Sequence, residues 1–356
     1  MDGRETIATI NLDNLSYNIN KIQEVTGKSL FGVVKANAYG HGDVECSRIM
    51  IEENLPFICV SSIDEAQRLV HKGINYDILI FSYVDPKIIA EQGKEHFIYT
   101  IPSIQWFREV TALNLNLRMH LEINVGMNRI GIKNDKEIEE ILSSDVPLEG
   151  IYTHLPSPEN LEKGKEQLTR FENIINASER NFKWIHVGNA PVSLIKDNTL
   201  INGFRMGLAV YGYRVDIPSL KPVLSLHSKI CHIDRVNPGE SIGYDYTYLV
   251  EKKEYFGTMP IGYADCFDVR NNLVPVYIKG KPYSIVGKIC MDQTMIRIDE
   301  SVYLGDEVEL IGPHRTCVEI ESITGISKYI QLSTLSERIT RHYTRKGQVV
   351  YIEKRK

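Results

Sequence analysis

Residues 30–40, LFGVVKANAYG, join an apolar run directly to a lysine and then to a loop. Residues 30–34 carry no charge, as in a parallel strand that is buried on both faces. Asn37 and Gly40 then predict a tight turn. Lys35 is therefore expected at the end of a strand, where α/β enzymes place their chemistry. Partial burial there would lower the pKa of the amine and favour reaction with a carbonyl group. A solvated loop lysine is the alternative interpretation.

Length and composition limit the class of protein. The chain has 356 residues, too many for one ordinary core, so two domains are expected. Hydrophobic residues make up 43% and charged residues 24%, which is a globular balance. The 41 basic and 46 acidic residues give a net charge of -5 without a long basic block, which disfavours nucleic-acid binding.

Other features concern location and thiol chemistry. No apolar stretch reaches the roughly 18 residues of a membrane span. Residues 1–6 lack the apolar stretch of a signal peptide. The 6 cysteines are scattered without a CxxC pair, which predicts reduced thiols rather than disulfides or a zinc ribbon. We therefore expect a cytoplasmic protein with no membrane partner.

Short apolar runs alternate with polar helical stretches over residues 1–221. The helical stretches include 63–71, which Ser62 and Glu65 begin as a capping box, and 159–178. The alternation predicts a (β/α)8 TIM-type barrel with its site on the C-terminal face of the strands. The apolar runs lie near 30–35, 57–60, 77–81, 97–100, 117–123, 148–152, 183–187 and 201–206.

After Pro222 the pattern changes to closely spaced strand-like runs with short turns between them. It predicts a mostly antiparallel β domain over 222–356, after a barrel domain over 1–221. The expected strands cover 224–236, 243–250, 256–264, 274–279, 283–290, 295–298 and 307–311.

A longer segment around the lysine resembles a known motif. Residues 33–42, VVKANAYGHG, are similar to the lysine motif of alanine racemases, which bind pyridoxal phosphate (PLP). Further family-like segments follow in order along nearly the whole chain. The resemblance implies the PLP-dependent fold type III, a barrel followed by a β domain. It also implies racemisation of alanine, which would supply D-alanine for peptidoglycan.

Racemisation needs PLP as an electron sink and two proton-transfer groups on opposite faces of the α-carbon. The resemblance assigns these catalytic roles to Lys35 and Tyr244. Tyr244 lies in 241–247, SIGYDYT, where the family usually has Ser-Tyr-Gly. The spacing to a stronger match at 260–265, PIGYAD, supports Tyr244. Tyr246 remains the alternative base.

The resemblance also gives supporting roles to a histidine and an arginine. His154, in GIYTH, would hydrogen-bond the catalytic tyrosine, whose pKa must fall from about 10 toward neutrality. Arg205, in FRMGLAVYG, would contact His154 and face the pyridine nitrogen of PLP. An arginine cannot give that nitrogen a full proton, so the ring would be a weaker electron sink. After His154 this chain reads Leu-Pro-Ser-Pro, where the family commonly has Phe-Ala.

The phosphate of PLP needs backbone N–H groups and hydroxyls. In the segment 186–190, HVGNA, Asn189 is kept as a cofactor-binding position, and Ala190 replaces the family's serine. One phosphate hydrogen bond is therefore expected to be missing or replaced by water. The other positions implied by resemblance are Tyr39, Gly207, Leu208 and Tyr343.

The largest departure from the family lies in 121–131, LEINVGMNRIG, where the family reads roughly Lys-Val-Asp-Thr-Gly-Met-Gly-Arg. Arg129 is kept and should contact the substrate carboxylate. Glu122 replaces a lysine that is often carbamylated, and would orient Arg129 with a permanent carboxylate. Asn124 replaces an aspartate, so one charge is lost. An incidental strand glutamate is the alternative interpretation of Glu122.

The β domain carries the remaining substrate positions, Met291 in 287–293, GKICMDQ, and Tyr263. In the family the corresponding groups reach the site from a second subunit, so a homodimer with shared active sites is implied. His227 and His232 lack further ligands, so no metal is expected.

Rival functions remain open at this stage. A serine or broad-specificity racemase is possible, because the departures touch the site. A related PLP-dependent decarboxylase is disfavoured by Arg205. A PLP carrier without activity is disfavoured by the C-terminal region, because such a carrier would be a lone barrel.

Overall fold

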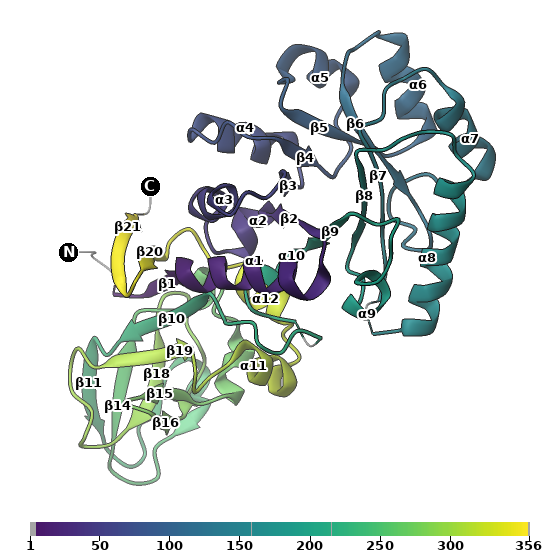
Figure 1. Cartoon of the computed structure of the whole chain (residues 1–356). Coiled ribbons are helices and arrows are strands. Elements are labelled where there is room, and N and C mark those ends of the chain that lie inside the picture. The colour runs from purple at the N-terminus through teal and green to yellow at the C-terminus, as the bar shows by residue number, and fades with distance from the viewer. Residues whose placement is uncertain (1–4, 158, 215, 355–356) are drawn as a thin grey trace. The chain divides into compact units, whose positions relative to one another are not determined.

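The computed structural model describes residues 5–157, 159–214 and 216–354, which form two compact units (Figure 1). One unit contains Leu15–Ala38 and Asp43–Lys221 and is called here the barrel unit. The other contains Tyr39–Gly42, the chain from Pro222 onward and the described residues up to Asn14, and is called here the sheet unit. In this division the N-terminal residues group with the segment from Pro222 onward.

Parallel strands close into a barrel in the barrel unit, as predicted. Each expected apolar run overlaps one strand, and parallel pairing of β2 with β9 closes the ring. The strands are almost entirely buried, which explains why they are apolar without alternation. They are β2 (Ser29–Val33), β3 (Ile58–Val60), β4 (Ile78–Ile80), β5 (Phe97–Ile101), β6 (Arg118–Ile123), β7 (Gly150–His154), β8 (Trp184–Gly188) and β9 (Gly203–Met206).

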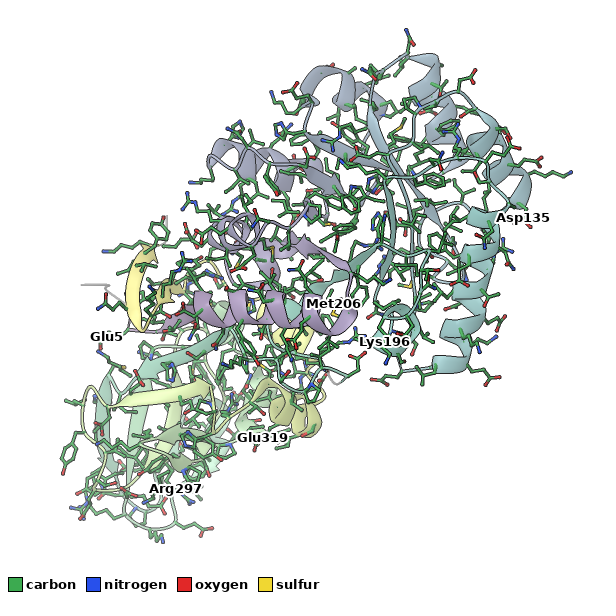
Figure 2. All side chains as sticks on the ribbon, viewed as in Figure 1. Glu5, Asp135, Lys196, Met206, Arg297 and Glu319 are labelled. Carbon is green, nitrogen blue, oxygen red and sulfur yellow. The ribbon has the colours of Figure 1, made fainter. Side chains whose placement is uncertain are left out.

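Helices follow the strands and lie around the barrel (Figure 1). In α4, Ile63, Ala66 and Leu69 are buried at a spacing of one turn, which gives the helix a single apolar face. On the outside, Asp135 at the start of α7 pairs with Arg170 at 2.8 Å (Figure 2). The helices that begin in this part of the chain are α1 (Leu12–Thr26), α2 (Lys35–Tyr39), α3 (Asp43–Glu52), α4 (Ile63–His71), α5 (Pro86–Gln92), α6 (Ile104–Ala112), α7 (Asp135–Ser143), α8 (Leu161–Asn176), α9 (Val192–Ile195) and α10 (Gly207–Val210).

The sheet unit is built mainly from antiparallel pairs, as predicted. Its largest sheet has the order β16-β15-β19-β10-β1-β20-β21, and a second sheet has the order β11-β14-β18-β17. The strands are β1 (Ile7–Asn11), β10 (Leu224–Lys229), β11 (His232–Val236), β12 (Ser241–Ile242), β13 (Tyr248–Leu249), β14 (Glu254–Met259), β15 (Val276–Ile278), β16 (Lys281–Tyr283), β17 (Ile285–Val286), β18 (Thr294–Ile298), β19 (Glu307–Ile311), β20 (Thr340–Arg345) and β21 (Gln348–Glu353).

The N-terminal strand β1 explains the grouping of the N-terminal residues. It pairs antiparallel with β10 and parallel with β20, in the middle of the largest sheet. Ala8 and Ile10 are fully buried, while the residues between them are half-buried. This alternation suits a sheet strand whose two faces meet different surroundings.

Other segments of the sheet unit differ from the expected strands. The run 224–236 is two strands in different sheets, β10 and β11. The run 243–250 is mostly turn, with only β13 extended. The remaining helical elements are η1 (Tyr244–Tyr246), η2 (Tyr263–Asp265), η3 (Val269–Leu273), α11 (Cys317–Thr324) and α12 (Lys328–Ser333). Over the described ranges, no helix is both long and apolar enough to span a membrane.

Candidate active site

Lys35 follows β2 at the end of the barrel where the parallel strands finish. Its side chain is half-buried. Burial is the main cause that lowers the pKa of Lys35, and the guanidinium groups of Arg129 and Arg205 lower it further. Glu65 and Cys59 act on this pKa in the opposite direction. The result is an amine that gives up its proton more easily than an ordinary lysine.

The backbone after Lys35 turns in the left-handed sense. Ala36, Asn37, Ala38 and Tyr39 have φ values of 51, 53, 53 and 52 degrees. Side chains other than glycine rarely adopt this conformation, and each such residue costs about 1–2 kcal/mol. A strained turn of this kind persists only where the surrounding contacts hold it.

Arg205, on β9, lies inside the barrel and is buried. Its Nη2 donates to the Thr153 carbonyl at 2.8 Å, and its Nη1 donates to Nδ1 of His186. Because arginine only donates, His186 must carry its proton on Nε2, which then donates to Nδ1 of His120 at 2.9 Å. Burial lowers the pKa of His186 well below its usual range and that of His120 to about 3. The partners of the guanidinium are thus uncharged.

His154 ends β7 next to Arg205. A Cβ on Gly188 would lie 2.6 Å from Nδ1 of His154 and 2.7 Å from Nη2 of Arg205, so only glycine fits between them. Burial, together with the charge of Arg205, lowers the pKa of His154 to about 3. The imidazole is therefore neutral near pH 7, and one of its nitrogens can accept a hydrogen bond.

Glu122, on β6, is buried, and its Oε2 accepts a hydrogen bond from the Tyr152 hydroxyl at 2.8 Å. The parallel register places Glu122 directly beside Tyr152 of β7. Oγ1 of Thr100 lies 2.8 Å from the same hydroxyl. Burial raises the pKa of Glu122, whereas the Tyr152 hydrogen bond and the nearby arginines lower it. The guanidinium carbon of Arg205 stands 4.3 Å from the centre of the Tyr152 ring.

Arg129 lies in the exposed loop after β6. Within the described ranges, neither a hydrogen bond nor an ion pair joins it to Glu122. Asn124 shapes the loop, because its Oδ1 accepts hydrogen bonds from the N–H groups of Gly126 at 3.1 Å and Asn128 at 3.0 Å. Asn124, which stands where the family has an aspartate, therefore keeps a side-chain oxygen that supports the turn.

The expected phosphate positions are divided between the units. Gly207 and Leu208 begin α10 directly after β9. Asn189 has a φ of 57 degrees, and its Nδ2 donates to the Leu155 carbonyl at 3.0 Å; Ala190 is buried beside it. In the sheet unit, a Cβ on Gly42 would fall 1.7 Å from the Tyr343 hydroxyl, so this glycine leaves the space that the hydroxyl occupies. The Tyr39 ring lies 6.3 Å from that of Tyr329.

The remaining predicted residues lie on the surface of the sheet unit. Tyr244 is 67% exposed, Tyr263 47% and Met291 53%. The Tyr263 N–H donates to the Cys290 carbonyl at 3.0 Å, next to Met291, so these two segments meet. Tyr246, the alternative base, is 83% exposed. Exposed aromatic and thioether side chains of this size are typical of a surface that binds a partner.

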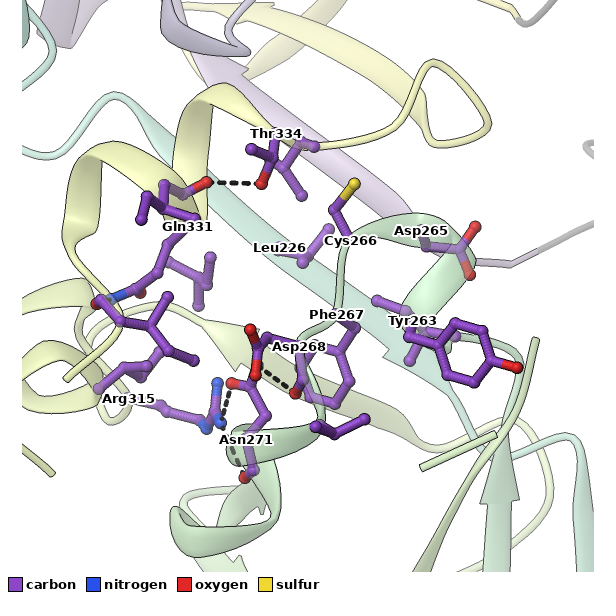
Figure 3. Close-up of a pocket in the computed structure, with 17 residues that line it drawn as sticks. Leu226, Tyr263, Asp265, Cys266, Phe267, Asp268, Asn271, Arg315, Gln331 and Thr334 are labelled. Atoms are coloured by element: carbon purple, nitrogen blue, oxygen red, sulfur yellow. Dashed lines mark hydrogen bonds between the residues drawn. The ribbon is translucent and has the colours of Figure 1, made fainter. Parts of the chain in front are cut away.

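Tyr263 is one of the residues that line a cavity of about 300 Å³ in the sheet unit (Figure 3). Most of its lining residues are apolar. Arg315 is fully buried at its wall and donates to Oδ1 of Asn271 at 2.7 Å. Cys266 also lines it and has a φ of 66 degrees. All of its lining residues belong to the sheet unit.

The structure thus brings Lys35, His154, Arg205 and Glu122 together at one end of the barrel. Tyr152, which contacts Glu122 and Arg205, and Glu65, which binds the N–H of the residue after Lys35, were not assigned site roles by the sequence interpretation. Tyr152 could have been found from sequence, because it stands two residues before His154 on one strand and so shares its face. Glu65 was recognised only as part of a capping box.

Comparison with known proteins agrees with this arrangement. The profile described as "Alanine racemase, N-terminal domain" matches residues 10–215, and "Alanine racemase, C-terminal domain" matches 223–343. The chain is 34% identical to the alanine racemase of Streptococcus uberis, over 96% of this chain and 98% of that one. It is 30% identical to alanine racemase 1 of Bacillus subtilis, over 98% of this chain and 95% of that one.

Solved structures give the same result. The alanine racemase of Bacillus anthracis with bound L-Ala-P aligns with a TM-score of 0.89 and 31% identity, covering 99% of this chain and 98% of that one. The enzyme of Clostridium difficile aligns with a TM-score of 0.91 and 31% identity, covering 99% of both chains. Both matched profiles and these relatives extend over nearly the whole chain, and the protein is therefore an enzyme of the alanine racemase family.

Proposed function

We propose that this protein interconverts L- and D-alanine, with pyridoxal phosphate bound through Lys35. The observation that carries the proposal is a half-buried lysine of lowered pKa at the end of the barrel strands, among buried groups that are charged or hydrogen-bonded. A site of this kind suits a lysine that reacts with a carbonyl group.

The residues present fit this cofactor. Lys35 offers a primary amine, and Arg205 offers a buried guanidinium whose hydrogen-bond partners are a carbonyl and a neutral imidazole. Its positive charge therefore remains available to a ring nitrogen. Asn189, Gly207, Leu208, Tyr39 and Tyr343 would hold the phosphate. When bound, the cofactor supplies an aldehyde that captures the substrate's amino group and a ring that withdraws electrons from the α-carbon.

The protein's own groups would then move the proton. Lys35, whose lowered pKa favours loss of its proton, would take or return the proton on one face of the α-carbon. Tyr244 would serve the opposite face, and the ring N–H of neutral His154 would donate a hydrogen bond to the tyrosine oxygen, which favours its deprotonated form. Arg205 would hold the pyridine nitrogen of the cofactor, and because an arginine keeps its own proton it would make the ring a weaker electron sink.

The substrate carboxylate would be held by Arg129, Met291 and Tyr263. In our proposal, Glu122 supplies the negative charge that steadies Arg129. Tyr244, Tyr263 and Met291 are exposed side chains of the sheet unit, and we propose that a second copy of the chain presents them to the site. The active protein would then be a homodimer with shared sites.

Borohydride reduction followed by peptide mapping tests whether the cofactor is bound through Lys35. The purified protein should absorb visible light, and borohydride should fix the cofactor covalently on Lys35, as peptide mapping would show. Lys35→Ala should lack both properties. A label found on another lysine would contradict the assignment.

The substrate is tested with a panel of L-amino acids. Alanine should be racemised with the highest kcat/KM. Serine is the alternative to examine, because Glu122 and Ala190 differ from the family pattern near the site. If serine has the higher kcat/KM, serine and not alanine is the substrate. The proposed proton-transfer groups would be unchanged.

A further inference from the structure

The Glu65 carboxylate binds the backbone at the ends of two barrel strands. Its Oε1 accepts the Ala36 N–H at 2.7 Å, and its Oε2 accepts the Ser61 N–H at 2.6 Å. Ala36 directly follows Lys35, and Ser61 directly follows β3. The carboxylate therefore ties the lysine-bearing turn to the neighbouring strand with two charge-assisted hydrogen bonds.

This geometry differs from the capping box that the sequence predicts. The Ser62 hydroxyl does accept the Glu65 N–H at 3.3 Å, which caps α4. In a full capping box, the Glu65 carboxylate would return to the N–H of Ser62. It reaches Ser61 and Ala36 instead, so the side chain does more than start its own helix.

The left-handed turn needs such support. Ala36, Asn37 and Ala38 all have positive φ, and two other contacts help to hold them. The Asn37 Oδ1 accepts the Asp43 N–H at 3.0 Å, and the Ala38 N–H donates to the Val34 carbonyl at 2.8 Å. Glu65 holds the first residue of the turn, which is the one that determines where Lys35 leaves the strand.

The charges around Lys35 give Glu65 a second effect. Arg129 and Arg205 are cations that oppose protonation of the amine, and Glu65 is the carboxylate that favours it. Buried Cys59 also raises the pKa of this lysine, and Lys35 in turn lowers the pKa of His154. Glu65 is thus a negative charge fixed by two backbone hydrogen bonds beside an amine with two cationic neighbours.

We propose that Glu65 is a positioning residue of the active site: its carboxylate holds the left-handed turn after Lys35 and gives the lysine a fixed negative neighbour. This inference rests on the proposed role of Lys35 in binding the cofactor. It makes two separate claims, one about the backbone and one about charge, and each has its own measurement.

The test uses the full-length enzyme as purified and compares Glu65→Gln with Asp64→Asn. Asp64 is the preceding residue of α4 and is exposed, so its substitution removes the same charge without touching the turn. In Glu65→Gln the amide can accept only one of the two N–H groups. Hydrogen exchange should become roughly tenfold faster at Ala36 or at Ser61, whichever N–H loses its acceptor, as expected for loss of a charge-assisted bond. Asp64→Asn should leave both rates unchanged.

The effect of the Glu65 charge is measured by a pH titration of the visible absorbance of the cofactor on Lys35. The midpoint should shift to lower pH in Glu65→Gln, because the protonated nitrogen loses its negative neighbour. Glu65→Asp keeps the charge on a shorter side chain, so exchange should still rise while the midpoint moves less. Wild-type exchange and midpoint in Glu65→Gln, or equal changes in Asp64→Asn, would overturn the inference. Absorbance that persists in Lys35→Ala would refute the role of Lys35, whereas the exchange rates would still report on the turn.

Discussion

At the level of single residues, Glu122 and Tyr152 form a buried pair at the position where the family often has a modified lysine. The Glu122 carboxylate is short and stays inside the barrel, where the Tyr152 hydroxyl donates to it at 2.8 Å. The Tyr152 ring in turn faces the Arg205 guanidinium. The Tyr152 side chain therefore contacts both Glu122, the proposed anion, and Arg205, the arginine proposed to bind the cofactor.

Glu122→Gln keeps the size of the side chain and removes its charge. We expect weaker binding of alanine, because Arg129 loses a nearby negative charge. The increase should appear mainly in KM. Activity of the unsubstituted enzyme should not depend on bicarbonate, because its carboxylate needs no carbamylation. Wild-type kcat and KM in Glu122→Gln would favour the alternative of an incidental glutamate.

Tyr152→Phe removes the hydroxyl and keeps the ring that faces Arg205. The hydrogen bond lowers the pKa of Glu122, so its loss should raise this pKa further. The carboxylate would then become protonated at higher pH, and the acidic limb of the kcat/KM profile should move upward in pH. Thr100→Val is the matched control, because it removes the other partner of the Tyr152 hydroxyl and leaves Glu122 its donor. If the acidic limb does not move, the Tyr152 hydrogen bond does not control the charge on Glu122.

Tyr244 and Tyr246 are two exposed tyrosines of one short turn, and substitution distinguishes them. Tyr244→Phe should keep the cofactor absorbance and reduce racemisation by roughly 10²–10⁴-fold, the usual contribution of a general acid–base group. Solvent isotope effects should differ between the L and D directions. Near-normal rates in Tyr244→Phe, with loss in Tyr246→Phe, would transfer the role to Tyr246.

At the level of elements, the barrel strands bury several histidines in neutral form. His120 on β6 and His154 on β7 both have pKa values of about 3 because of burial. Unfolded histidine titrates near 6.5. As pH falls below about 6.5, the unfolded chain takes up protons that the folded barrel does not, so low pH favours unfolding.

The free energy of unfolding should therefore fall as pH decreases from 7 to 5. Each of these histidines contributes a slope of at most about 1.4 kcal/mol per pH unit between its unfolded and folded pKa values. Urea unfolding at several pH values measures this slope. His120→Gln removes one of the titrating groups and should make the slope shallower. A flat dependence in the unsubstituted protein would show that the buried histidines are not neutral as inferred.

Local sequence pattern was sufficient for the barrel strands and for α4, because their signals are continuous burial and one-turn apolar spacing. It was insufficient for β1, whose neighbours β10 and β20 lie more than two hundred residues away in the chain. It also joined β10 and β11 into one strand, because the break between them depends on which sheet each enters. Glu65 was missed for a related reason, because its partners Ala36 and Ser61 lie at the ends of two different strands. Tyr152 was missed although its spacing to His154 on one strand places both side chains on the same face.

At the level of the whole molecule, the proposed groups are divided between two units. Lys35, His154 and Arg205 belong to the barrel unit, whereas Tyr244, Tyr263 and Met291 belong to the sheet unit. The latter three are largely exposed. A symmetric dimer could use this division, because each chain would supply its lysine to one site and its tyrosine to the other.

Mixing two inactive variants tests whether Lys35 and Tyr244 of one active site come from different chains. Lys35→Ala and Tyr244→Phe, allowed to exchange subunits, should regain roughly a quarter of the normal activity, since half of the dimers are hybrids and each hybrid contains one intact site. Two different affinity tags would measure how much hybrid forms. The matched control mixes Lys35→Ala with Arg205→Ala. Both of these residues lie in the barrel unit, so every hybrid site lacks one of them and activity should stay absent. Recovery only in the first mixture supports a site shared between chains. Hybrids without activity in both mixtures would place Lys35 and Tyr244 of a single chain in the same site.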